Sequence, residues 1–285
     1  MEGTVTAAHG AEVAGASPLE KLPEEIQALQ HHLSSLDVGS SYLNIAGIEF
    51  HFTNYLFFLI IGVLLVLTVV FLGVKKIALV PKSKVSNAVE ALAEFVRNDI
   101  AIAQIGHGSD KYLPFLTTVF FFILINNVIG LIPGSKPGTG TMGVTVALAT
   151  FVFAYYNIAG VKAQGGLKYL LSFAPKGVPF PMNALVWVIE VFSAFLRILT
   201  LSVRLFANMF AGHLILGIFA LLTALFFEPL LEQFSTGTLL GALPSAGWLL
   251  LMTALYTLEV LVAALQAYIF TLLSAVYIGQ AVHEH

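Results

Sequence analysis

The sequence predicts an all-α, polytopic membrane protein with about five membrane-crossing helices, an interfacial amphipathic helix, and two long final helices forming a steeply inclined hairpin. Apolar residues make up 58% of the 285 residues and charged residues only 10%, whereas about a quarter of an ordinary soluble domain is charged. The apolar residues also fall in runs of about twenty, the length of helix that crosses a hydrocarbon layer of about 30 Å. A bilayer is therefore the solvent in which this chain is expected to fold.

Composition argues against several classes of function. The sequence contains no cysteine, so disulfides, thiolate nucleophiles and cysteine-ligated metal sites are excluded. Its net charge is −3 and its basic residues are scattered, which argues against a nucleic-acid partner. No Gly-rich Walker loop ending in Lys-Ser or Lys-Thr is present, so no nucleotide site is predicted. We expect no cofactor and no metal, and interpret His283, Glu284 and His285 as a solvated end.

The chain divides into a polar amino-terminal arm, residues 1–53, and a membrane domain, residues 54–285. Within the arm, an apolar face at helical spacing predicts a helix over Pro23–Leu36. The first residues lack the basic and apolar regions of a secretory signal, so we expect the amino terminus to stay on the chain.

Three apolar runs predict the first membrane spans, at Tyr55–Val74, Tyr112–Ile132 and Met142–Val161. Between the first two spans, Ser86–Ile105 carries apolar residues at helical spacing with charged residues opposite them. That pattern predicts a helix lying on the membrane interface rather than crossing it.

The last third of the chain holds two overlong apolar segments. Met182–Phe227 contains no proline, and no glycine before Gly212, which predicts one helix about 65 Å long at 1.5 Å per residue. Gly247–Gly279 is also longer than a bilayer requires. Since the ordinary tilt of about 20° cannot absorb such a mismatch, the two segments are expected to form an inclined hairpin joined by a Gly-rich loop, Phe234–Ala246.

Lys and Arg residues predict the orientation, because they concentrate in loops on the inner side. They gather between the first two spans, over 75–111, and after the third span, over 162–181, whereas the opposite loops hold few or none. The amino terminus is therefore predicted outside and the carboxyl terminus inside.

Ionisable residues within the two long helices are the candidates for function. An Arg at the centre of a membrane helix costs about 2.5 to 3.5 kcal/mol on insertion scales, so it normally faces a cavity, a counter-charge or a partner. Four of the candidates, Glu190, Arg197, Arg204 and Asn208, are spaced by seven, seven and four residues, which puts them on one stripe of a helix. The candidates are Glu190, Arg197, Arg204, Asn208, His213, Glu259 and Gln266.

Structural roles compete with functional ones at several of these positions. Glu190 and Arg197 could equally form a structural pair near the inner interface, and Asn126 and Asn127 are better interpreted as helix-to-helix hydrogen bonders. For His213 and Glu259 a proton relay is favoured, since a histidine changes charge near neutral pH and a buried carboxyl group can titrate in the same range. A structural ion pair between Arg204 and Glu259 is the weaker alternative.

A specific resemblance emerges from the run Arg204-Leu-Phe-Ala-Asn-Met-Phe-Ala-Gly-His213, with Leu265–Phe270 and Val276-Tyr277 in the last helix. These motifs resemble the a subunit of F-type ATP synthase, and Pro181-Met-Asn183, Glu190 and, more loosely, Asn127–Pro133 extend the match. The resemblance covers most of the chain from the first span onward. Gly130 stands where some members carry an acidic residue, so the resemblance does not identify the residues of the outer entrance of the proton path.

The resemblance implies a non-catalytic stator that lies against a rotating ring of c subunits, with peripheral-stalk b subunits and the rest of the complex as further partners. It assigns proton translocation to Arg204, Asn208, His213, Glu259 and Gln266. Glu190, Arg197 and Asn127 would be pathway or structural residues. Two offset half-channels would feed and drain the ring, and ATP chemistry would belong to other subunits.

Two other functions compete with that of a stator. A self-contained secondary transporter usually shows duplicated halves, and no repeat is visible in the sequence. A purely structural membrane scaffold leaves the cost of Arg204 unexplained. We favour protons over sodium as the ion, and a bacterial plasma membrane over an organellar energy-transducing membrane.

Overall fold

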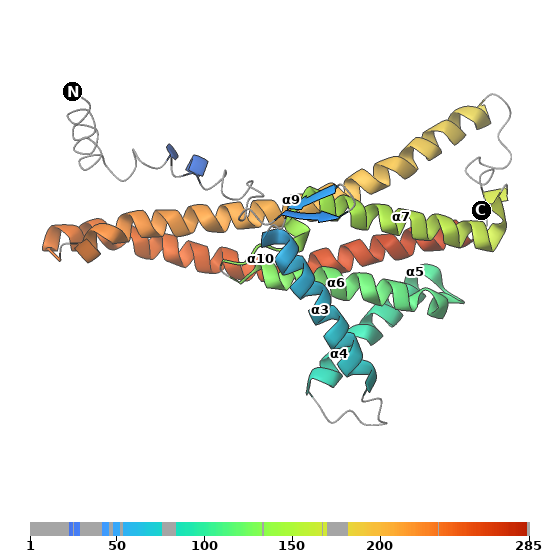
Figure 1. Cartoon of the computed structure of the whole chain (residues 1–285), viewed down its shortest axis with the longest axis horizontal. Helices are drawn as coiled ribbons and strands as arrows, with labels where there is room; N and C mark the ends of the chain where they lie inside the picture. Colours follow the sequence, from blue (N-terminus) through green and yellow to red (C-terminus); the bar gives the residue numbers. More distant parts are fainter. Residues whose placement is uncertain are drawn as a thin grey trace. The chain divides into compact units, whose positions relative to one another are not determined.

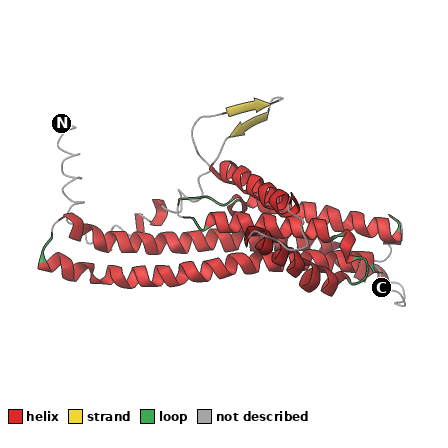
Figure 2. Ribbon diagram, turned by 90° about the horizontal axis from the view of Figure 1, so that it is seen from below, coloured by secondary structure: helices red, strands yellow, loops and turns green. Residues whose placement is uncertain are grey.

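The computed structural model describes residues 23–24, 26–28, 42–45, 48–51, 54–75, 84–132, 134–166, 168–169, 182–232 and 234–283. The described elements are helical apart from one hairpin, in which β1 (Tyr42–Ile45) pairs antiparallel with β2 (Ile48–His51) (Figure 2). The predicted all-α, polytopic class is confirmed, whereas the hairpin within the polar arm was not foreseen. Most of the helix predicted over Pro23–Leu36 lies outside the described residues.

The predicted spans agree closely with the observed helices (Figure 1). Four described helices are long and apolar enough to cross a membrane, and a shorter apolar stretch, Tyr55–Phe71, lies within the first helix. Pro114 sits in the first turn of the helix Leu113–Gly130, where its missing N–H removes no hydrogen bond. The helices are α3 (Asn54–Lys75), α6 (Leu113–Gly130), α7 (Met142–Gln164), α9 (Met182–Glu232) and α10 (Thr236–Val282).

The predicted interfacial segment is helical throughout. It consists of α4 (Lys84–Phe95), a π-helical stretch (Val96–Ile102) and α5 (Ala103–Ile105). Val96 and Ile100 are fully buried while Glu90 and Glu94 are exposed, so the helix is amphipathic as its sequence pattern indicates. Its place on the membrane interface stays a prediction.

The loop predicted over Phe234–Ala246 is wrong, because α10 already begins at Thr236 and includes Pro244. Ser235 caps the new start: its N–H donates to the Thr238 hydroxyl at 2.9 Å, and its carbonyl accepts from the Leu239 N–H at 2.9 Å. A side chain three residues into a helix that bonds back to the cap residue is a known helix-start arrangement. Helices in membranes also tolerate glycine and proline better than soluble ones.

The structure divides into two compact units, residues 1–37 with 210–259 and residues 38–209 with 260–285. The core of the larger unit is built on α6, which packs against α3 and the π-helical stretch. Its fully buried side chains include Ile100, Leu116, Ile123, Phe270 and Ile278.

Gly279 allows α10 to lie directly on the backbone of α5. A Cβ added there would stand 2.6 Å from the Gln104 carbonyl oxygen, which is backbone and cannot rotate away. We expect Gly279→Val to destabilise the protein by about 1 to 3 kcal/mol, the range for overpacking. The check is the thermal unfolding midpoint of the purified protein. Gly143→Val is the matched control, because no described residue outside its own helical turn lies within 4 Å of its added Cβ. An equal shift in both variants would contradict the packing argument.

Candidate functional site

Arg204 lies well inside α9, which extends from Met182 to Glu232 over 51 residues. The side chain is exposed on the chain, whereas its neighbours Leu201 and Leu205 are buried. Within the described part of its own unit, the guanidinium forms no hydrogen bond and no ion pair. The arginine therefore presents a charge on the surface of an apolar helix that no described residue of its own unit compensates.

Beside Arg204, α9 packs on α10 through a seam of buried side chains. Leu205 and Met209, four residues apart on one face of α9, are almost fully buried, as are Ala263 and Ala267 of α10. Alanines let two membrane helices approach closely. The seam places Arg204 on the flank of the contact, where its side chain extends away from the packed interior.

Asn208 of α9 and Gln266 of α10 add buried amide groups to the larger unit. Gln266 is 5% exposed, and the side-chain nitrogens of both residues are buried without a hydrogen-bond acceptor among the described residues. A buried donor left in this way costs about 1 to 3 kcal/mol unless an acceptor reaches it. These amides mark a polar strip within otherwise apolar helices.

Glu259 of α10 lies against the backbone of α9 in the smaller unit. Its side chain is 7% exposed, and a Cβ added to Gly212 would collide with its carboxylate. His213 is the next residue along α9 and is half-buried. The structure thus brings Glu259 beside the helical turn that carries His213, but its buried Oε1 atom has no hydrogen-bond partner among the described residues, so the relay stays a prediction.

Glu190 and Arg197 form an ion pair, one of the two interpretations left open by their spacing. The Arg197 Nη2 atom lies 2.8 Å from Glu190 Oε1, and the guanidinium carbon lies 5.0 Å from the centre of the Tyr277 ring. The side chain of Arg197 is 21% exposed and that of Glu190 is 40% exposed, so water screens the pair in part.

We expect Arg197→Gln to lower stability by about 1 kcal/mol, because it removes both a half-exposed ion pair and a cation–π contact. A double-mutant cycle with Glu190→Gln, measured by thermal unfolding, checks this. If the effects of the two substitutions simply add, the pair contributes nothing.

Asn127 connects three parts of the larger unit. It is fully buried, its Oδ1 accepts from the Thr139 hydroxyl at 2.9 Å, and its Nδ2 donates to the Ala263 carbonyl of α10 at 3.3 Å. This is the helix-to-helix bonding that the sequence favoured for Asn127, whereas the Asn126 Nδ2 atom donates to the Phe122 carbonyl of its own helix at 2.8 Å. Thr139 and Gly212 are the two contacts that sequence reasoning missed, although a glycine within a long helix is costly enough to suggest a packing reason.

Among the groups outside the membrane-crossing helices, Tyr169 and Lys136 have pKa values shifted from their ordinary ones. Burial, reinforced by the nearby Tyr156, raises the pKa of Tyr169 to about 12 although Arg197 opposes the shift. Its hydroxyl donates to Asn157 Oδ1 at 3.0 Å. Burial lowers the pKa of Lys136, whose ammonium lies 5.2 Å from the centre of the Tyr55 ring.

Comparison with known proteins decides the family. The family model described as ATP synthase A chain matches residues 55–279, a range that includes all the candidate residues. The chain belongs to this family. The resemblance deduced from the arginine motif is therefore confirmed, and the chain is a membrane subunit of the F-type ATP synthase.

Bacterial members of the ATP synthase A chain family are similar over most of their length. Subunit a of Chlorobium phaeobacteroides is 34% identical over 98% of this chain and 78% of its own. Subunit a of Gluconacetobacter diazotrophicus is 37% identical over 83% of this chain and 90% of its own. These relatives and the apolar helices support a bacterial membrane protein.

Proposed function

We propose that this chain is the proton-channel stator of the ATP synthase, with Arg204 facing the carboxylates of the c ring between two offset half-channels. Proton flow through the half-channels would turn the ring and thereby drive ATP synthesis. The observation that carries the proposal is the exposed guanidinium within a 51-residue apolar helix, for which the described residues of its own unit supply no ion pair. An arginine in such a place needs a counter-charge, and a ring carboxylate supplies one.

The chemistry follows from the fixed charge of arginine. A guanidinium is not deprotonated in a protein, so Arg204 would stabilise the ionised form of each ring carboxylate that passes it. The carboxylate would release its proton on one side of Arg204 and take up another on the other side. The same fixed charge would repel a proton moving directly between the half-channels. The membrane potential supplies about 2.3 kcal/mol per charge for each 100 mV.

The remaining candidates are assigned by their surroundings. Glu259, His213 and Asn208 would serve the outer half-channel, a role supported by the burial of Glu259 beside the His213 turn. Gln266 would help to position Arg204 and the ring carboxylate, although no hydrogen bond joins it to Arg204. We assign Asn127 and the Glu190–Arg197 pair to holding the helices in place.

Topology and partners follow from the same proposal. The basic loops would lie in the cytoplasm, with the amino terminus outside and the carboxyl terminus inside. The c ring would lie along the Arg204 face of α9, and the b subunits of the peripheral stalk would hold the chain against rotation.

Cysteine crosslinking tests where the ring lies, because the chain has no native cysteine. Ala207 is exposed and lies three residues after Arg204 on the same side of α9. In the assembled complex, Ala207→Cys should form a disulfide with a cysteine placed beside the ring carboxylate. The control is Ile158→Cys on α7, where the native side chain is 54% exposed. Equal crosslinking at both positions, or none at Ala207→Cys, would refute the assigned ring position.

A further inference from the structure

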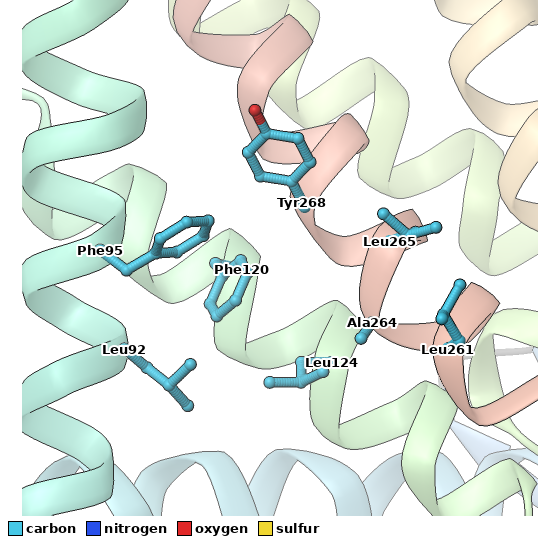
Figure 3. Close-up of a pocket in the computed structure, with 8 residues that line it drawn as sticks. All are labelled: Leu92, Phe95, Phe120, Leu124, Leu261, Ala264, Leu265 and Tyr268. Carbon is cyan, nitrogen blue, oxygen red and sulfur yellow. The ribbon is translucent and has the colours of Figure 1, made fainter.

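Two apolar hollows lie beside the amphipathic helix α4 in the larger unit. The first has a volume of about 540 Å³ and lies between α4, α6 and α10 (Figure 3). The second has a volume of about 350 Å³ and lies between α3, α4 and α6. Leu92 of α4 and Leu124 of α6 line both. The hollows are therefore two lobes of one groove, separated by this pair of side chains.

The lining shows what kind of molecule fits the groove. In the first lobe, the Tyr268 hydroxyl is the one polar side-chain group among the eight residues drawn in Figure 3. A water molecule needs two to four polar partners, and an empty apolar space forfeits the dispersion contacts of its walls. A partner helix in a membrane would pack on small residues or hydrogen-bonding groups, whereas leucine and phenylalanine dominate here. A flexible acyl chain fits both the shape and the chemistry.

Among the described residues that line the groove, one charged residue marks one end. Lys84, the first residue of α4, lines the second lobe, is exposed, and forms no ion pair with any described residue. Val69 lines the same lobe six residues before the end of α3, about 9 Å along the helix at 1.5 Å per residue. The lobe thus opens near the end of a membrane-crossing helix, at the depth where lipid headgroups lie. The acidic side chains of α4, Glu90 and Glu94, line neither lobe.

We propose that this groove binds one anionic phospholipid, with its two acyl chains in the two lobes and its phosphate beside Lys84. The tails gain little by leaving the surrounding lipid, which is equally apolar. Selectivity must therefore come from the headgroup, and basic pockets between membrane helices are known to hold anionic headgroups. This inference needs only the membrane setting and does not depend on the proton pathway.

Photolabelling of the intact complex tests the proposal. The complex would be placed in nanodiscs that contain phosphatidylglycerol with a photoreactive acyl chain or, in parallel, phosphatidylcholine with the same chain. Mass spectrometry would locate the labelled residues. We expect phosphatidylglycerol to label α4, α6 and α10 preferentially. Lys84→Gln should reduce the preference for phosphatidylglycerol about fivefold, the effect of one lysine near an anionic headgroup, and Lys84→Arg should retain it.

Filling each lobe provides a second, independent arm of the experiment. Ala264→Trp fills the first lobe and Ala88→Trp the second, so each should abolish labelling in its own lobe. Ala91→Trp is the matched control, because Ala91 is exposed on the same helix and lines neither lobe. Equal labelling by the two lipids in the unmodified complex would overturn the proposal. So would labelling that both lobe-filling variants leave at the level of the control, or labelling confined to another subunit. ATP-driven proton pumping, measured separately, reports whether each complex has assembled.

Discussion

Complexes that carry Arg204→Ala are expected to lose coupled proton transport completely. If Arg204 faces the ring as proposed, its loss leaves an ionised ring carboxylate without a counter-charge in the apolar layer. The carboxylate would then keep its proton beside the stator. The measurement is the ATP-driven acidification of vesicles that contain the reconstituted complex. Arg204→Lys is expected to fail as well, since an ammonium is a point charge without the planar fork of donors.

The matched control for Arg204 is Arg97→Gln. Arg97 forms an ion pair with Asp110 at 3.1 Å, and both side chains are more than half exposed, so its removal is expected to leave pumping unchanged. Copurification of the c subunit would show that the Arg204 variants assemble. Normal pumping by assembled Arg204→Ala complexes would refute the stator proposal.

Gly212→Ala is the second substitution expected to have a large effect. Its new methyl group would collide with the Glu259 carboxylate and push it out of its place beside the His213 turn. Displacing a proton-transferring group costs about 10² to 10⁴ in rate where that group acts in the slow step. We therefore expect ATP-driven proton pumping to fall by at least about tenfold, measured in the same vesicles.

Two further variants separate a local collision from general damage to the helix. Gly212→Ala combined with Glu259→Asp shortens the carboxylate by one methylene and should recover part of the lost transport. Gly241→Ala introduces the same methyl group into α10 at a position where no described residue outside the local helix lies within 4 Å of the added Cβ, so it should be neutral. Full activity in Gly212→Ala alone would show that Glu259 does not depend on this contact.

The membrane-crossing helices could be predicted from sequence because their signal is local. An apolar run of sufficient length must form a helix in lipid, where each backbone N–H and C=O needs a partner within the segment. The sequence does not predict the start of α10, because glycine and proline usually indicate a loop. The capping pair of Ser235 and Thr238 was already present in the sequence, and in a bilayer it outweighs Pro244.

The site could be predicted only in part, since helical periodicity gives the face of a residue but not its neighbour on another helix. The stripe of Glu190, Arg197 and Arg204 was visible in the spacing. The bond from Asn127 to the Ala263 carbonyl, across 136 positions of sequence, and the contact of Glu259 with Gly212 arise only from tertiary packing. The hairpin of β1 and β2 pairs Leu43 with Phe50 and Ile45 with Ile48, an alternation that the apolar signal of the spans overshadowed.

The hydrogen bond from Asn127 to the Ala263 carbonyl also determines how α10 can respond to mechanical force. A slip of α10 by one turn, about 5.4 Å, would break this bond and move Ala263 away from Leu131 and Met209, with which it is packed. If a c ring turns against this chain as proposed, torque on α10 would therefore pass into α6 and the rest of the larger unit, and the helices would not slide past each other.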